Sequence, residues 1–252
     1  MKLARLHTSV SFMVLIVLWE ILARFSGWSR YVFPDPLTVV AGMAELIKNG
    51  TLLKHTIASL YRVTWGFYLA IVFGIPLGIL LGRVTVLHRM ANPLIQFLRP
   101  ISPLAWIPLS MLWFGIGDRP AIFLIFLSSF FPLTVSTTIA VRNINPTYFQ
   151  VAANFNFSKF ETIFRLIVPA IVPEVVTALR ISVTIAWLVV VAAEMIAVQS
   201  GLGYLILDSR NALRMDYVMD GMIIIGIIGL LLDTLMKRLA KIESARWGAQ
   251  AR

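Results

Sequence analysis

The sequence contains no cysteine and few charged residues. Of its 252 residues, 13% are charged and 59% are hydrophobic, whereas soluble domains contain about 25% charged and about 45–50% apolar residues. The lack of cysteine excludes a disulfide framework, a thiolate nucleophile and a Cys-ligated metal. The lack of charge excludes an ordinary soluble protein, because so few charged side chains cannot cover the surface of a folded chain this long. A lipid bilayer accounts for the composition.

Residue patterns for catalysis and for nucleotide binding are also missing. The three histidines, His7, His55 and His88, are far apart and have no neighbours at metal-ligand spacing. The Ser, His and acidic residues form no recognisable catalytic arrangement, and no phosphate loop of the form GxxxxGK[ST] occurs. We therefore expect a non-catalytic chain that binds no metal, no ATP and no other cofactor.

The net charge of +10 raises the question of nucleic-acid binding. The basic residues form no stripe; they flank apolar segments and are densest at the C-terminus, at Lys237, Arg238, Lys241, Arg246 and Arg252. Membrane proteins that follow the positive-inside rule have this distribution. We expect no nucleic-acid binding, and both termini in the cytoplasm.

Six apolar segments are long enough to cross a bilayer, which takes about 20 residues in a helix. They are residues 9–25, 63–82, 93–116, 119–141, 173–197 and 217–236. The first lacks a cleavage site, so we interpret it as a retained N-terminal span. The sequence predicts one all-α membrane domain over residues 1–252, with core spans over about 63–236 and a short interfacial helix over 37–49.

Two of the predicted spans contain unusual residues. Gly74, Gly78 and Gly82 recur every four residues and share one helix face, which is either a static packing face or a moving interface. The third span is interrupted by Pro93, Pro100, Pro103 and Pro108. It should be a broken helix, and irregular backbone at membrane depth survives only against protein or a water-filled cavity.

The longest predicted cytoplasmic segment between two spans is residues 143–173. Asn145 and Pro146 predict the start of a short helix over 147–155, and Ser158 with Glu161 has the capping-box spacing for a second short helix. Phenylalanines at four positions, 155, 157, 160 and 164, give the segment an apolar surface. It is either a packed intracellular hairpin or a rigid knob that fits a groove on a partner.

Within this segment, VAANFNFSKFETIFRLIVPAIVP resembles the EAA loop of bacterial binding-protein-dependent ABC importer permeases. Ala152, Ala153 and Pro169 match the pattern, while Val151 stands where an acidic residue is common and Phe157 where glycine is common. Other stretches resemble the nitrate, sulfonate, taurine and bicarbonate branch of these permeases: RPISPLAWIPLSMLWFGIG at 99–117, ALRISVTIAWLVVVAAEMI at 178–196 and GLGYLI at 201–206.

The resemblance implies a role and an assembly. The chain would form the pathway for a small anion such as nitrate, bicarbonate or an organosulfonate across a bacterial inner membrane. A second permease copy, expected to be identical, would pair with two ATPase subunits or domains that use ATP and Mg, and a binding protein would deliver the substrate. The residues implied in ATPase coupling are Val151, Ala152, Ala153, Asn154, Phe157, Ser158 and Pro169.

Five residues are candidates for the translocation pathway: Pro103, Trp106, Arg180, Trp187 and Glu194. An ionisable group within a span is costly and is a functional candidate by default. Arg180 either attracts an anion or anchors neighbouring helices, and Glu194 is expected to cap or pair at the outer surface. The two tryptophans serve either the pathway or packing.

Two further acidic residues are placed to form ion pairs along a helix. Glu20 lies four residues before Arg24, and Asp233 lies four residues before Lys237. This order and spacing favour an ion pair on the surface of one helix. We expect both pairs to be structural.

Two other functions suit a multi-pass membrane protein. A secondary transporter usually has internal repeats and carboxylates near the midplane of the membrane. A membrane enzyme needs a cluster of polar catalytic groups near the interface. Neither pattern is evident in this sequence.

Overall fold

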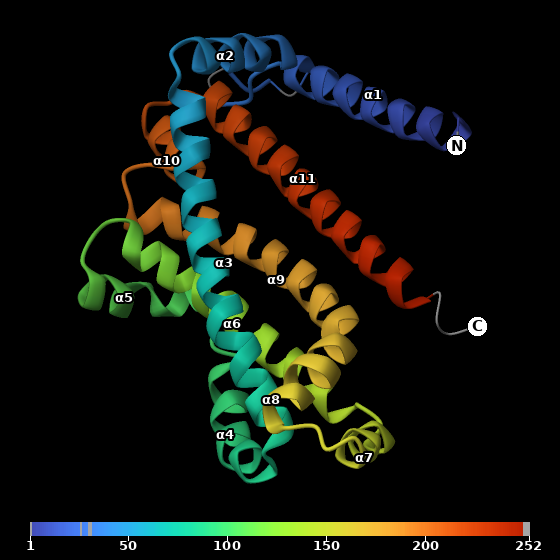
Figure 1. Cartoon of the computed structure of the whole chain (residues 1–252). Helices are drawn as coiled ribbons and strands as arrows, with labels where there is room; N and C mark the ends of the chain where they lie inside the picture. Colours follow the sequence, from blue (N-terminus) through green and yellow to red (C-terminus); the bar gives the residue numbers. More distant parts are fainter. Residues whose placement is uncertain (1, 26, 30–31, 249–252) are drawn as a thin grey trace.

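The computed structural model describes residues 2–25, 27–29 and 32–248, so that Arg252 of the basic C-terminus lies outside the described residues. Every regular element within these ranges is a helix, which confirms the predicted all-α class (Figure 1). The elements are α1 (Lys2–Phe25), α2 (Pro36–Lys48), α3 (Thr51–Arg83), α4 (Thr85–Leu98), η1 (Pro103–Trp106), α5 (Ile107–Phe114), α6 (Asp118–Arg142), α7 (Pro146–Asn154), α8 (Lys159–Glu161), η2 (Thr162–Ile167), α9 (Val168–Ala197), α10 (Leu202–Asn211) and α11 (Met215–Gly248).

Four helical segments of the described chain are long and apolar enough to cross a membrane. They are Thr51–Arg83, Asp118–Arg142, Lys159–Ala197 and Met215–Arg238. The other two predicted spans, 9–25 and 93–116, fall on α1 and on the run from α4 to α5, which ends at Phe114. Neither is among the four, so the predicted count of six spans is not confirmed.

The first core span, α3, starts earlier than predicted, directly after the corner that joins α2 to α3. Asp35 caps α2, because its carboxylate accepts a hydrogen bond from the backbone N–H of Thr38 (2.9 Å). Gly50 adopts a left-handed conformation with φ 72°, which lets the chain turn directly into α3. The helix predicted over 37–49 is confirmed. The predicted start at residue 63 is wrong: α3 begins at Thr51, and its 33 residues extend about 50 Å.

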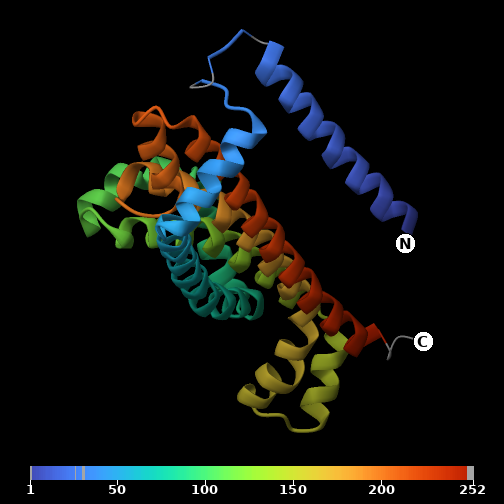
Figure 2. The same ribbon diagram turned by 90° about the horizontal axis from the view of Figure 1, so that it is seen from above.

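Helix α2 is fastened to the start of α11. Arg214 lies just before α11 and forms ion pairs with Glu45 of α2 (3.3 Å) and with Asp216 (2.7 Å). Hydrogen bonds from Tyr217 and from Arg214 hold the pKa of Glu45 below its usual value. Helix α1, in contrast, projects away from the other helices in both views (Figures 1 and 2).

The parallel pair α3 and α6 defines the two ends of the molecule. Asp118, at the start of α6, contacts Arg62 in the first half of α3, while Val141, near the end of α6, packs against Gly82 near the end of α3. We call the end that carries α7 and α8 the α7 end, and the opposite end, which carries α2 and α10, the α10 end (Figure 1).

The chain returns between these ends through a broken helix. From Arg83 it runs back to Asp118 through α4, η1 and α5. Helix α4 ends at Leu98, and α5 begins only at Ile107, with a 3₁₀ turn between them. The break predicted from the prolines is therefore confirmed.

Close contact between α3 and α6 depends on the absence of side chains. A Cβ atom added to Gly78 would lie 2.5 Å from Thr137 Cβ, and one added to Gly82 would lie 2.5 Å from Val141 Cβ. Both distances are far inside van der Waals contact, so the two backbones approach closely only because these positions are glycine. Helix α9 packs on α6 to complete the core, in which Leu124, Leu133 and Val190 are fully buried.

Substituting Gly78 with alanine should destabilise the protein. The new methyl group would overlap Thr137 and force α3 away from α6, at a cost of about 1–3 kcal/mol. The measurement is thermal unfolding of the purified protein in detergent. Gly226→Ala is the matched control, because a Cβ at Gly226 has no heavy atom within 4 Å among the described residues. Equal unfolding midpoints for the two variants would contradict the close-packing argument.

Candidate functional site

The segment between α6 and α9 begins with two capped helix starts. Asn145 accepts a hydrogen bond from Thr147 N (2.9 Å) at the start of α7. Ser158 and Glu161 form a capping box, in which Ser158 Oγ accepts from Glu161 N (3.2 Å) and Glu161 Oε2 accepts from Ser158 N (3.0 Å). Asn156, with φ 53°, makes the corner between the two starts. Both predicted helix starts are confirmed.

The second helix is not separate from the fifth predicted span. The predicted cytoplasmic segment ended at residue 173, but helix continues without interruption from Lys159 to Ala197. The six residues of η2 form a π-helix, in which the N–H of Val168 bonds to the carbonyl of Ile163, five residues back. Pro169, which has no N–H to donate, lies just after this wider turn, in the first turn of α9. Together α7, α8 and η2 form a compact unit, which we call the knob.

One side of the knob is fixed to the body of the protein. Ala152 is buried, and its carbonyl accepts from Phe157 N (3.0 Å). The guanidinium of Arg83, the last residue of α3, lies 4.3 Å from the centre of the Phe149 ring. Phe149 also packs on the apolar cluster that includes Ile167.

The other side of the knob is exposed and apolar. Phe155, Phe160 and Phe164 are 73%, 69% and 56% exposed. The rings of Phe160 and Phe164 pack on each other, with centroids 4.4 Å apart. The implied coupling residues divide between the two sides: Ala152 is buried, Phe157 and Pro169 are half-buried, and Val151, Ala153, Asn154 and Ser158 are exposed.

A buried polar network lies at the α10 end. Arg62 is 1% exposed and Glu194 is fully buried, with Arg62 Nη1 2.6 Å from Glu194 Oε1. Arg62 also pairs with Asp118 (2.7 Å) and donates to the carbonyl of Ser200 (2.7 Å). Glu194 accepts a further hydrogen bond from Ser59 Oγ (2.8 Å). The network ties α3, α6, α9 and the loop after α9 together.

The end of the loop after α9 and the first turn of α10 close over this network with their backbone. The N–H groups of Gly201, Leu202 and Gly203 donate to His55 Nδ1 (3.0 Å), Ser59 Oγ (2.9 Å) and Glu194 Oε2 (3.0 Å). Glu194 thus has a partner, as expected, but in the interior rather than at the surface. The predicted start at residue 63 hid this, because it left Arg62 outside the span. An unpaired carboxylate in a span is itself a signal to look for a buried cation.

Arg180 and Trp187 lie on the other flank of α9, against α11. Arg180 Nε is 2.8 Å from Asp233 Oδ1, and Asp233 also pairs with Lys237 (2.6 Å). Trp187 is buried, and its indole N–H donates to the carbonyl of Ile225 (3.0 Å). Arg180 therefore has the contacts expected of an anchor between helices. The predicted ion pair of Asp233 with Lys237 is confirmed, as is that of Glu20 with Arg24.

Pro103 and Trp106 bracket the 3₁₀ turn in the broken helix. Pro103 follows Ser102, whose side chain caps the turn. Trp106 lies in an aromatic group with Trp113, their ring centroids 6.4 Å apart, and Trp113 in turn contacts Phe123 of α6 (5.9 Å). Both tryptophans thus contact neighbouring aromatic rings.

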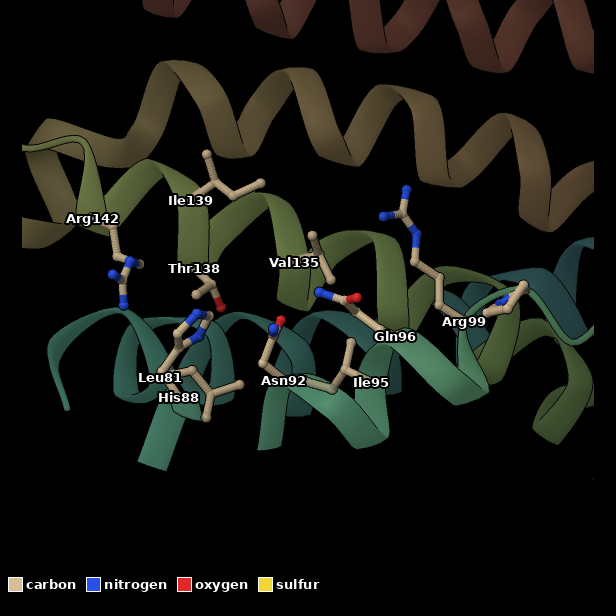
Figure 3. Close-up of a pocket in the computed structure, with 11 residues that line it drawn as sticks. Leu81, His88, Asn92, Ile95, Gln96, Arg99, Val135, Thr138, Ile139 and Arg142 are labelled. Atoms are coloured by element: carbon tan, nitrogen blue, oxygen red, sulfur yellow. The ribbon is translucent and has the colours of Figure 1, made fainter. Parts of the chain in front are cut away.

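The broken helix also forms one wall of a cavity of about 780 Å³ against α6 (Figure 3). The cavity is lined by Leu81, His88, Asn92, Ile95, Gln96, Arg99, Pro100, Val135, Thr138, Ile139 and Arg142. This set contains two arginines and a histidine but no carboxylate, as far as the described residues go. None of the five candidate pathway residues is among the residues that line this cavity. The sequence signal that was missed is the four-residue spacing of His88, Asn92 and Gln96, which puts polar groups on one face of α4.

Comparison with known proteins identifies the family. Residues 74–248 match the family model described as the binding-protein-dependent transport system inner membrane component. The chain belongs to this family. The resemblance noted in the sequence is thereby confirmed, and the chain is an inner-membrane permease component of this class.

The relatives are similar over most of their length. A putative ABC transporter permease of Methanocaldococcus jannaschii is 39% identical over 86% of this chain and 83% of its own. A putative aliphatic sulfonates transport permease of Bacillus subtilis is 35% identical over 90% of this chain and 83% of its own. A nitrate import permease of Synechocystis is 35% identical over 90% and 85%.

A solved structure shares the fold. The MetNI methionine ABC transporter, in an inward-facing conformation, contains a chain that matches with a TM-score of 0.67. The match covers 77% of this protein and 96% of that chain, at 16% sequence identity. The permease fold is therefore shared although few residues are.

Removing the charge of Arg62 should destabilise the protein strongly. Arg62→Ala leaves Glu194 buried without its cation, which costs about 3–5 kcal/mol. The double variant Arg62→Leu with Glu194→Leu removes both charges and should recover part of this loss. Arg210→Ala, at an exposed position of α10, is the control. Thermal unfolding in detergent distinguishes them, and an Arg62→Ala midpoint equal to that of Arg210→Ala would refute the role of the ion pair.

Proposed function

We propose that this chain forms the translocation pathway of an ATP-driven importer for a small anion such as nitrate, bicarbonate or an organosulfonate. The observation that carries the choice of an anion is the lining of the cavity between α4 and α6. It combines Arg99, Arg142 and His88 with no acidic side chain among the described lining residues. Cavities lined by one sign of charge concentrate ions of the opposite sign. The names of the Bacillus and Synechocystis relatives, which refer to sulfonates and nitrate, support the same class.

The knob is the proposed docking site for a separate ATPase. Its exposed phenylalanines form an apolar surface at the α7 end, and such surfaces mark sites of interaction with another protein or with a membrane. Its other side is held by Arg83 and by the cluster around Ile167, so a push on the knob would move it as a rigid body. ATP and Mg would be used by the partner ATPase subunits, because the chain has no phosphate loop.

The orientation follows from charge. Arg83, Arg89, Arg142, Lys159 and Arg165 all lie at or near the α7 end. By the positive-inside rule, we place this end and both termini in the cytoplasm. The α10 end then faces the binding protein that delivers the substrate. A second copy of the chain completes the permease, as the family resemblance implies.

Uptake by reconstituted complexes tests the proposed function. Proteoliposomes that hold the permease, its cognate ATPase and its binding protein should accumulate radiolabelled nitrate, bicarbonate or methanesulfonate only with ATP, and not when the ATPase is omitted. Arg142→Glu reverses a charge in the cavity and should reduce uptake roughly tenfold or more. Arg89→Glu, next to His88 on α4 but outside the cavity lining, is the matched control. Uptake that persists without any ATPase would instead indicate a secondary transporter.

Substitution of Ala153 tests the docking site. Ala153 is exposed on α7, so Ala153→Arg should not disturb folding but should obstruct a closely fitting partner. We expect loss of ATPase co-purification and of ATP-dependent uptake, with an unchanged unfolding midpoint. Ala44→Arg, at an exposed position on α2 at the α10 end, should retain the ATPase. Full co-purification and normal uptake with Ala153→Arg would refute docking at the knob.

A further inference from the structure

The cavity wall formed by α4 has an ordered row of polar side chains. His88, Asn92 and Gln96 are four residues apart, and Arg99 follows three residues later. On an α-helix these positions share one face, and the row from residue 88 to residue 99 is about 16 Å long. All four residues line the cavity. Figure 3 shows Asn92 and Gln96 between α4 and α6, with Arg142 on the side of His88 and Arg99 at the opposite end.

The charges of this row are at its ends. Arg99 lies at one end, and Arg142 of α6 lies near His88 at the other. Between them, Asn92 and Gln96 contribute neutral amides, each with two N–H donors. A permeating ion needs contacts that replace its water but are weak enough for it to leave. Neutral amides between two cationic groups meet that requirement for an anion better than a continuous row of arginines would.

Apart from Arg142 at its end, the facing wall of α6 offers no free donor in the described lining. Val135 and Ile139 are apolar. The hydroxyl of Thr138 donates to the carbonyl of Thr134 (2.7 Å) and lies 3.3 Å from the carbonyl of Gly78, so its hydrogen is already engaged. The neutral N–H donors for an anion in the middle of the cavity therefore come from Asn92 and Gln96.

We infer that Asn92 and Gln96 are specificity-determining residues. Between the cationic ends of this row, they favour the passage of a small oxyanion that carries no ammonium group. This inference rests on the proposed function and refines its substrate class. A zwitterion such as an aminosulfonate also carries an ammonium group, which would have no carboxylate partner in the described lining and would be repelled by Arg99 and Arg142. Nitrate, bicarbonate and simple alkylsulfonates carry no such group.

The test uses the complete complex in proteoliposomes, with nitrate, bicarbonate, methanesulfonate and taurine as separate probes. Asn92→Leu and Gln96→Leu should each reduce uptake of the transported anion roughly tenfold, since each removes hydrogen bonds to an ion that has left water. Asn92→Asp keeps the size of the side chain and adds a negative charge, so it should abolish uptake. Gln96→Asn retains the amide and should keep most of the activity.

Further measurements separate specificity from structure. All four variants should keep the wild-type unfolding midpoint and should co-purify with the ATPase, because the residues lie outside the knob and the buried core. Normal anion uptake by both leucine variants, or wild-type uptake of taurine as fast as of a simple anion, would overturn the inference and leave the proposed function standing. Failure of the wild-type complex to take up any of the anions would instead overturn the proposed function.

Discussion

The buried ion pair of Arg62 with Glu194 is the interaction on which the arrangement of the helices at the α10 end depends. A carboxylate and a guanidinium within membrane-spanning helices are tolerated only when their hydrogen-bonding groups are satisfied. Here Glu194 accepts from Arg62, Ser59 and the backbone of Gly203, and Arg62 reaches on to Asp118 and Ser200. Three spans and the loop before α10 therefore share one set of polar contacts. Separating any one of them would expose a charge to an apolar surrounding.

The α7 end is built differently. The contacts described there are apolar packing around Ile167 and the stacking of Arg83 on Phe149, without a buried ion pair. The cavity and the knob are also adjacent in the chain, since Arg142 ends α6 and α7 begins at Pro146. Only three residues, 143–145, therefore separate Arg142, at one end of the cavity, from the start of the knob. The protein combines one end held by directional hydrogen bonds with another held mainly by packing.

Much of this fold could be predicted from the sequence, where the cause is local. Composition indicated helices in a membrane, Asn145 and Ser158 marked two helix starts, and the prolines of the third apolar segment marked its break. The start of α3 could not be found in this way. Its first part contains the polar residues Lys54, His55 and Arg62, which the predicted span left out. His55 and Arg62 are accommodated there by partners far away in the chain, Gly201 and Glu194.

The candidate site could be predicted only where its structure has a local cause. The knob is formed by consecutive residues, so its position and caps were visible in the sequence. The cavity needs α4 and α6 together, and neither shows from its own residues which face it turns to the other. The continuation of the helix through Pro169 was not visible in the sequence, because a proline normally interrupts a helix. A π-helical turn before it lets the helix continue.

The π-helix η2 also sets the direction of α8 relative to α9. A π-turn is equivalent to one residue inserted into an α-helix, and one residue corresponds to about 100° of rotation. The direction of α8, with Phe160, relative to α9 therefore depends on the present length of η2. Deleting one residue of η2 other than Phe164 would turn Phe160 by more than a quarter of a circle relative to α9, although both phenylalanines would remain. The number of residues in this stretch, and not only their identity, therefore sets the direction of the aromatic side chains.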